Sequence, residues 1–335
     1  RPDILTELAR ALRDGPGRER QVHILLENDA NHARYLERDA ACRPLAASAQ
    51  WNDDLHHALH ILSTGERDGY YEDYATRPLW YLGRSLAQGF GYQGEPSPHR
   101  DGAPRGEPSA HLPPAAFVSF LQTHDQVGNR ALGERLSAIA EPQALRAAVA
   151  CVLLAPSVPL LFMGEEFAAS TPFLFFCDFG AELAAAVTRG RRLEFARFAR
   201  FSDPAAQAAI PDPNAPATFA ASKLHWDEIA RPPHEEWLAL YRELLALRHR
   251  MIVPRLAGMR CGGEFAIEHG VLRVNWTLGE RSRLHLAANF SAGASPALTL
   301  PPGELLYASA APSNGSADQG ALPAWSVLFT LEAAA

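Results

Sequence analysis

The chain has 335 residues, of which 47% are hydrophobic, and its formal net charge is −7. This length suits a large domain with a smaller one beside it, and the apolar content is enough for a substantial core. The acidic balance argues against a nucleic-acid partner, which would favour a basic face. The longest apolar run, residues 147–163, is interrupted by Pro156 and Pro159, so we expect no membrane-spanning segment and no membrane partner.

Several chemistries lack support in the sequence. The four cysteines lie far apart, with neither CxxC spacing nor a zinc-type His/Cys cluster, so we expect free thiols in a reducing compartment and no metal site. The sequence contains no GxSxG, Walker or GxGxxG motif that would indicate a serine hydrolase, a P-loop or a dinucleotide site.

Short apolar runs alternate with helical patterns through the first 250 residues, after a first helix at Ile4–Arg13. This alternation is typical of a parallel α/β architecture. The predicted strands are Gln21–Leu26, Ala47–Trp51, Phe117–Thr123 and Pro159–Met163. The predicted helices are Asp53–Leu62, Thr76–Ala87, Gln143–Leu154 and His234–Arg250.

Each predicted strand ends in polar or acidic residues. Glu27 follows the first strand, Asp53 follows the second and Asp125 follows the third. Glu165 and Glu166 follow the fourth, where one structural and one solvated carboxylate would be the ordinary outcome. In a (β/α)8 barrel the chemistry lies just beyond the C-terminal ends of the strands, so we expect these acids to meet at one rim.

The segment Gln50–Tyr74 is rich in side chains that suit a sugar. Carboxylates and imidazoles bond hydroxyl groups, and aromatic faces cover sugar rings. An alternative reading is a solvated helix followed by a surface loop. The residues that we expect to contact a ligand here are Trp51, Asp53, Asp54, Tyr70 and Tyr71.

Two loop regions and a change of pattern complete the chain. Gly89–Pro114 is long and rich in Gly, Pro and Ser, so we expect either a lid or wall of a cleft or a disordered loop. Ser202–Ser222 is a second expected loop.

After Arg250 the strands are expected to form a small antiparallel sheet or sandwich. We therefore predict two domains, residues 1–253 and 254–335, with expected strands at Phe265–Ile267, Val271–Trp276, Arg283–Asn289, Ala297–Leu300 and Ser326–Leu331.

Two of the acids could cleave a glycosidic bond, which requires a proton donor and a second carboxylate. Glu27 suits the acid, because partial burial at a strand end would keep it protonated. Asp125, beside His124, could stabilise positive charge or bind hydroxyl groups. Each acid taken alone could instead belong to a helix cap, but their equivalent positions favour chemistry.

These residues resemble the α-amylase superfamily of retaining glycosidases, and within it the family of malto-oligosyltrehalose trehalohydrolases. The THDQ segment is typical of the whole superfamily, whereas WNDDLHHALHILSTGE and GEEFAASTPFLFF point to the trehalose-releasing family. The resemblance covers most of the first 250 residues, in the stretches His23–Asn31, Gln50–Ala75, Phe120–Leu136, Leu160–Phe179, Gly190–Phe195 and Ser222–Trp226.

The resemblance implies a role for each matching residue. Glu27 matches the general acid/base, Asp125 the transition-state stabiliser and His124 a substrate-binding imidazole; Gln126 lies beside them. The implied activity is hydrolysis of the α-1,4 bond that joins trehalose to a malto-oligosaccharide, without a cofactor, in the cytoplasm and as a step of trehalose biosynthesis. The implied fold is barrel strands five to eight followed by a β-sandwich.

One feature of the resemblance is missing. The family's nucleophile is an aspartate in a DGLRLDAVH-like strand, and no such segment occurs in these residues. Without it the two-step retaining reaction is not expected to proceed. Two alternatives stay open: another superfamily enzyme, such as a branching or debranching enzyme, and a glycan-binding fragment without catalysis.

Overall fold

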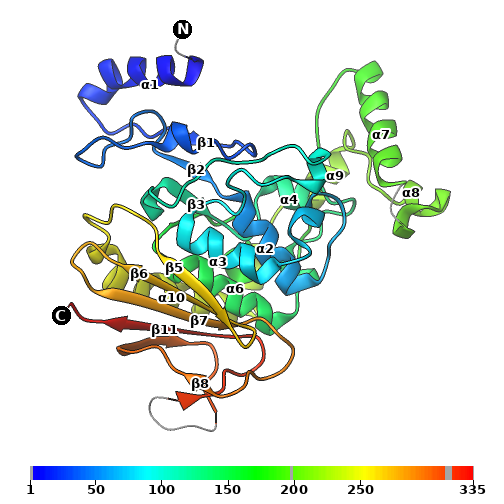
Figure 1. Cartoon of the computed structure of the whole chain (residues 1–335). Helices are drawn as coiled ribbons and strands as arrows, with labels where there is room; N and C mark the ends of the chain where they lie inside the picture. Colours follow the sequence, from blue (N-terminus) through cyan, green and yellow to red (C-terminus); the bar gives the residue numbers. More distant parts are fainter. Residues whose placement is uncertain (1–2, 197–198, 314–318, 335) are drawn as a thin grey trace. The chain divides into compact units, whose positions relative to one another are not determined.

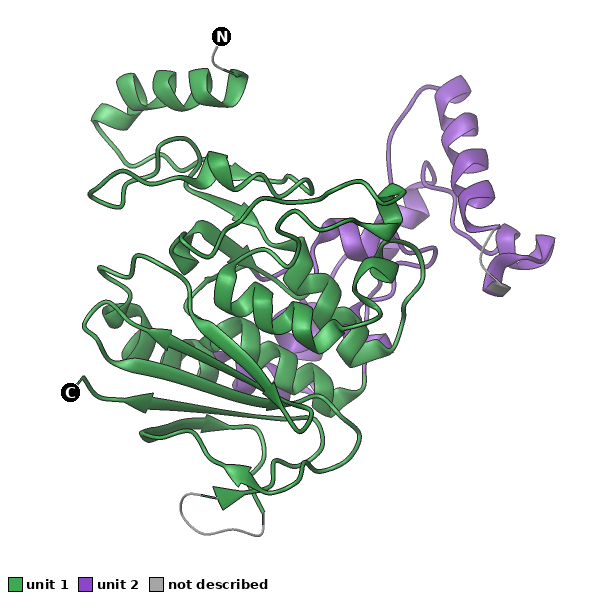
Figure 2. Cartoon of the chain, viewed as in Figure 1, with its two compact units in different colours: residues 1–121, 141–160, 243–335 green, residues 122–140, 161–242 purple. Residues whose placement is uncertain are grey.

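The computed structural model describes residues 3–196, 199–313 and 319–334. Its contacts divide the chain into two compact units (Figure 2). Unit 1 comprises residues 1–121, 141–160 and 243–335, and unit 2 comprises residues 122–140 and 161–242. Because unit 1 contains residues from both predicted domains, the predicted boundary after residue 253 stays a prediction.

Unit 1 contains a four-stranded parallel sheet, in the order β1-β2-β3-β4 (Figure 1). The predicted parallel arrangement is confirmed, although each strand is shorter than expected. The fourth strand also begins and ends earlier than predicted. Pro159 has no N–H to donate to the ladder. The last hydrogen bond runs from Leu160 N to Ser119 O (2.8 Å), after which the chain leaves the sheet. The bounds are Leu25–Leu26 (β1), Ala49–Trp51 (β2), Phe117–Ser119 (β3) and Val158–Pro159 (β4).

The helices of unit 1 begin and end at recognisable caps. Helix α2 starts after Asn52, whose side chain accepts a hydrogen bond from Leu55 N, and it ends at Gly65 with φ +77°. Asp53 and Asp54 occupy its first turn, where the helix dipole favours negative charge. Among the described residues, the α-helices that lie wholly in unit 1 are α1 (Ile4–Asp14), α2 (Asp53–Thr64), α3 (Pro78–Gln88) and α6 (Pro142–Leu154), and the end of α10 also belongs to it.

The C-terminal part of unit 1 forms a five-stranded antiparallel sheet, in the order β5-β6-β7-β11-β9 (Figure 1). The predicted antiparallel sheet is confirmed. Two strands were not predicted, Glu304–Ala308 (β9) and Gln319–Gly320 (β10). The other bounds are Glu264–Glu268 (β5), Val271–Thr277 (β6), Arg283–Asn289 (β7), Leu298–Thr299 (β8) and Ser326–Glu332 (β11).

This sheet packs on helix α3. The indole of Trp276 donates a hydrogen bond to Leu86 O at 3.0 Å. At Gly83 an added Cβ would lie 2.5 Å from the Phe265 ring and 2.7 Å from Leu272, closer than carbon atoms pack. A glycine at this position therefore lets the helix approach the sheet.

Unit 2 is helical and loop-rich, and its described residues contain no strand. The region Ser202–Ser222, expected as a loop, contains two short helices that each begin with proline. Proline is favourable at the first helical position, so prolines here begin short helices within the region that was expected to be a loop. Unit 2 holds α4 (His124–Gly128), α5 (Leu136–Ile139), α7 (Ala181–Phe195), α8 (Pro204–Ala208), α9 (Pro216–Ala221) and the first turns of α10 (His234–Leu247).

Candidate active site

Glu27 and Asp53 follow neighbouring strands of the parallel sheet at the same end. Leu26 in β1 pairs with Gln50 in β2, so Glu27 and Trp51 continue side by side where the ladder ends. The Glu27 side chain is exposed, and not partly buried as expected, and it makes no hydrogen bond to the residues that the structure describes. A free carboxyl at the C-terminal edge of parallel strands is the placement expected of a catalytic group.

Asp53 is a half-buried carboxyl in a negative environment. Burial raises its pKa to about 7, and the charges of Asp54 and Glu27 add to this effect, while Arg105 opposes it. A carboxyl with this pKa holds a proton up to near-neutral pH. Asp53 can therefore donate a hydrogen bond to a ligand hydroxyl or exchange a proton beside Glu27.

Asp54, its neighbour, has a different environment. It is fully buried, and its Oδ2 accepts hydrogen bonds from Asn31 Nδ2 (2.8 Å), Gly91 N (2.7 Å) and Tyr92 N (2.9 Å). Its Oδ1 contacts Arg105 Nη2 at 3.0 Å. Because protein groups occupy both oxygens, Asp54 is placed to hold the site together and not to bind ligand hydroxyls as expected.

The loop Gly89–Pro114 is anchored by buried charges. Arg105 is 6% exposed and also lies 3.7 Å from Asp73. Asp73 in turn accepts hydrogen bonds from Ser97 Oγ (2.6 Å) and His99 N (2.8 Å). The loop is therefore fixed to α2 and to residues 69–74, which rules out the disordered loop; its role as a cleft wall stays a prediction.

The two predicted tyrosines have unequal environments. Tyr71 is buried, stacks on His60 at 4.1 Å between ring centroids, and its hydroxyl lies 3.2 Å from His56 Nε2. Burial lowers the pKa of His56 to about 3, so the His56 imidazole is neutral. Tyr70 is 40% exposed and packs on His57 at 5.1 Å. Of the two tyrosines, only Tyr70 stays exposed, and its contact with a ligand remains a prediction.

Trp51 is the last of the predicted site residues in unit 1. It is half-buried at the end of β2, and the edge of its ring meets Phe120 at 5.6 Å between centroids. This contact fixes the indole next to the position where Glu27 leaves the sheet.

The predicted residues of unit 2 lie in the first turn of α4. His124 and Asp125 are exposed, and His124 Nε2 lies 3.8 Å from Asp125 Oδ1. The Gln126 side-chain oxygen accepts hydrogen bonds from Thr123 N (2.7 Å) and Thr123 Oγ1 (2.6 Å). Gln126 thus completes a capping box. The capping box fixes the first turn of α4, which carries Asp125. Because the side-chain oxygen of Gln126 is occupied, only its side-chain NH2 group could bind a ligand.

Unit 2 also holds a buried acid. Glu165 is 6% exposed and accepts a hydrogen bond from Tyr241 at 2.9 Å, whereas Glu166 is only half-buried. This fits the expected division into one structural and one more solvated group. Burial raises the pKa of Glu165 to about 7. Its partner Tyr241 was not expected, because nothing in the sequence links two residues so far apart.

The predicted site residues are shared between the two units. Glu27, Trp51, Asp53, Asp54, Tyr70 and Tyr71 belong to unit 1, and His124, Asp125 and Gln126 belong to unit 2. The convergence of Glu27 with Asp125 therefore stays a prediction.

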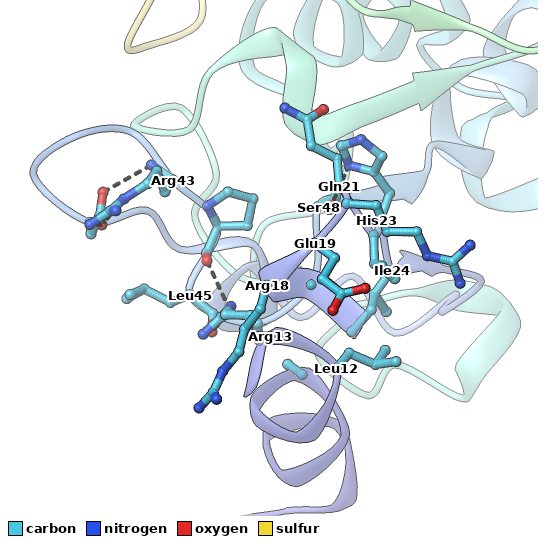
Figure 3. A pocket seen from close by; sticks show the side chains of 17 residues that line it. Leu12, Arg13, Arg18, Glu19, Gln21, His23, Ile24, Arg43, Leu45 and Ser48 are labelled. Atoms are coloured by element: carbon cyan, nitrogen blue, oxygen red, sulfur yellow. Dashed lines mark hydrogen bonds and ion pairs between the residues drawn. The ribbon is translucent and has the colours of Figure 1, made fainter. Parts of the chain in front are cut away.

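A cavity of about 830 Å³ lies elsewhere in unit 1, beside the segment that leads into β1 (Figure 3). No predicted site residue lines it. Arg13 in its wall donates a hydrogen bond to Pro44 O at 2.9 Å, and Arg43 pairs with Asp39 at 2.8 Å. These contacts partly occupy Arg13 and Arg43 in the cavity wall. The wall does not contain the strand-end carboxyls Glu27 and Asp53. The candidate active site is therefore at the strand ends and not in this cavity.

The described residues contain no group of three or more His, Cys, Asp or Glu side chains that could hold a metal ion. None of their helices combines the length and apolar character that crossing a bilayer requires.

The sequence of this chain is similar to those of several known proteins. The chain is 41% identical over 282 residues to a malto-oligosyltrehalose trehalohydrolase of Arthrobacter ramosus, covering 82% of this chain and 48% of that protein. The corresponding protein of Mycobacterium tuberculosis is 36% identical over 318 residues, covering 93% of this chain and 52% of that protein. The chain thus spans about half the length of the relatives that it matches.

A solved structure and a family profile extend this comparison. The crystal structure of a Salmonella typhimurium protein, provisionally described as an α-amylase, has 42% sequence identity and a TM-score of 0.88. The match covers 98% of this chain and 54% of that one. A family described as a domain of unknown function, DUF3459, matches residues 262–329, the region of the antiparallel sheet.

Proposed function

Because this chain belongs to the malto-oligosyltrehalose trehalohydrolase family of the α-amylase superfamily, we propose that it carries the acid/base half of a retaining glycosidase. Glu27 is the general acid and base, and Asp125 is the carboxylate that stabilises the transition state. The substrate is a malto-oligosyltrehalose, and the bond cleaved is the α-1,4 bond next to its trehalose end. The reaction releases trehalose, as a cytoplasmic step of trehalose biosynthesis.

The observation that carries this proposal is the position of Glu27. It follows β1 within the stretch His23–Asn31, its carboxyl is free of protein hydrogen bonds among the described residues, and Asp53 lies at the next strand end. A protonated Glu27 would donate its proton to the leaving glycosidic oxygen and recover it from water in the second step. Asp53, which holds a proton up to about pH 7, would bond a sugar hydroxyl beside it.

The retaining mechanism also needs a nucleophilic carboxylate, which the resemblance places in a DGLRLDAVH-like strand that these residues lack. We propose that strands β1–β4 are strands five to eight of a (β/α)8 barrel, within a domain of residues 1–253, followed by a sandwich of residues 254–335. The remaining strands would pair with the open edges of β1 and β4 and would supply the nucleophile. Residues 1–335 alone would then bind glucan without turnover.

A fusion protein tests this proposal. Residues 1–335 are joined to the part of the Arthrobacter ramosus relative that precedes the matched region, and trehalose release from maltotriosyltrehalose is measured. We expect Glu27→Gln to lower kcat by several orders of magnitude, because the amide cannot protonate the leaving oxygen. The matched control is Glu264→Gln, an exposed glutamate at the start of β5 in the antiparallel sheet. Activity of Glu27→Gln near that of the control would end the assignment.

The products decide between this function and a second candidate in the same superfamily. A branching or debranching enzyme would share Glu27 and Asp125 but would yield transferred branches or linear maltose. Release of free trehalose supports the first function, and its absence together with branched products supports the second.

A further inference from the structure

Unit 2 (purple in Figure 2) exposes a group of phenylalanine rings in contact with one another. The ring centroids of Phe173 and Phe176 are 5.7 Å apart, and those of Phe176 and Phe219 are 5.1 Å apart. Phe176 is 38% exposed and Phe219 is 48% exposed. Exposed aromatic rings that touch one another offer a surface on which the apolar face of a ligand can lie. Phe173, Phe176 and Phe219 are called the phenylalanine cluster below.

The phenylalanine cluster is held rigidly although residues 173–177 belong to no helix or strand. Phe173 N donates a hydrogen bond to Gly133 O (2.9 Å), and Cys177 N donates one to Pro213 O (2.9 Å). Between them, Leu174 N donates to Ser222 Oγ at 3.0 Å. Because the backbone is tied at these points, little conformational entropy remains to be lost when a ligand binds the rings.

The cluster is continuous with the helix that carries Asp125. Gly128 is the last residue of α4, and an added Cβ there would lie 3.5 Å from the ring of Phe173. Gly133 has φ +61°, and a Cβ there would come within 2.5 Å of Phe173 O. Phe173 therefore packs directly against the helix of His124 and Asp125, and Phe176 and Phe219 extend the same surface outward within unit 2.

The chemistry of the surface fits a sugar better than an apolar partner. The ammonium of Lys223 lies over the exposed Phe219 ring, 4.9 Å from its centroid, so a hydrogen-bond donor stands on one face of this ring. A glucose unit presents an apolar face of C–H groups and a rim of hydroxyls, and it can use both at once. A sugar offers hydroxyl acceptors to this ammonium, whereas an apolar side chain offers it none.

We propose that the phenylalanine cluster and Lys223 bind glucose units of the α-1,4-glucan part of the substrate, as an extension of the site at Asp125. The identity of the glucan rests on the proposed function. The surface acts by stacking on sugar rings and contributes no group to bond cleavage.

Calorimetric titration of the 335-residue chain with maltoheptaose tests this proposal. We expect saturable binding that Phe219→Ala and Phe176→Ala each weaken about tenfold, equivalent to about 1.4 kcal/mol. Phe219→Trp keeps an aromatic face and is expected to bind at least as tightly as the wild type. Leu193→Ala is the matched control, since Leu193 is an apolar residue of the same unit with 71% exposure, and its affinity is expected to be unchanged.

The remaining outcomes overturn the proposal. Absence of maltoheptaose binding to the wild type, or equal affinities of Phe219→Ala and Leu193→Ala, would exclude a glucan surface here. A change from dimer to monomer in Phe219→Ala, measured by size-exclusion chromatography, would assign the cluster to an interface between copies instead. The Glu27 assay is separate: loss of binding in the phenylalanine variants together with unaffected turnover in Glu27→Gln would retain this surface and reject the proposed function.

Discussion

Arg105 Nη2 lies 3.0 Å from Asp54 Oδ1, and this ion pair is almost completely buried, with exposures of 6% and 0%. The hydroxyl of Tyr74 donates a hydrogen bond to the same Asp54 oxygen and accepts one from Arg105 Nη1 at 2.5 Å. The charges of Asp54 and Tyr74 raise the pKa of Arg105 despite its burial. The pair joins the first turn of α2, where Asp53 lies, to the long loop that follows α3.

We expect Asp54→Asn to lower the free energy of unfolding by about 3 kcal/mol, because removing one partner leaves the buried guanidinium uncompensated. Asp29→Asn is the matched control: its pair with Arg100 is largely exposed, with Asp29 at 76%, and exposed pairs contribute at most about 1 kcal/mol. Urea unfolding of both variants gives the two values. Equal losses would show that the buried pair does not anchor the loop.

The bond between Tyr241 and Glu165 gives a second prediction. Tyr241→Phe removes a hydrogen bond to a buried carboxyl, which costs about 1–3 kcal/mol of stability. The double variant Tyr241→Phe/Glu165→Leu replaces both partners with apolar groups, and we expect it to be more stable than Tyr241→Phe alone. Guanidinium unfolding of the single and double variants provides the comparison. If the double variant loses as much free energy of unfolding as the two single variants added together, the two side chains are not coupled.

The parallel arrangement of the sheet could be predicted because short apolar runs alternate with helical patterns. Strand lengths could not. Residues Gln21–Ile24 look like a strand, but only Leu25 and Leu26 have partners in the ladder of β2. Pairing depends on a neighbouring segment far along the chain, which an apolar run by itself does not encode.

The different roles of Asp53 and Asp54 could not be predicted either. The two residues are adjacent and chemically identical, but consecutive positions in a helix point about 100° apart. One side chain therefore turns inward to Arg105, and the other stays at the strand-end surface. The partner Arg105 lies in a loop whose composition left a lid, a cleft wall or disorder open, so only the folded structure distinguishes an anchor from a candidate ligand-binding group.

The raised pKa of Asp53 predicts how stability depends on pH. Its ordinary pKa is 3.8 and its folded value is about 7, so between these values the folded chain binds a proton that the unfolded chain has lost. The stabilisation that this carboxyl contributes is fully present below about pH 4. It decreases as the pH rises to about 7, by at most about 1.4 kcal/mol per pH unit. Asp53→Asn removes this contribution, and we expect the variant to lose less stability than the wild type between pH 5 and pH 7.

Urea unfolding at several pH values measures that difference, and a control of opposite sign is present in the chain. Hydrogen bonds from Asn214 N and Thr188 lower the pKa of Asp212, so its contribution is present above its ordinary pKa and is lost only on acidification. Asp212→Asn should therefore leave the slope between pH 5 and pH 7 unchanged. If Asp53→Asn also keeps the wild-type slope, Asp53 is ionised throughout this range and cannot donate a hydrogen bond to a sugar hydroxyl beside Glu27.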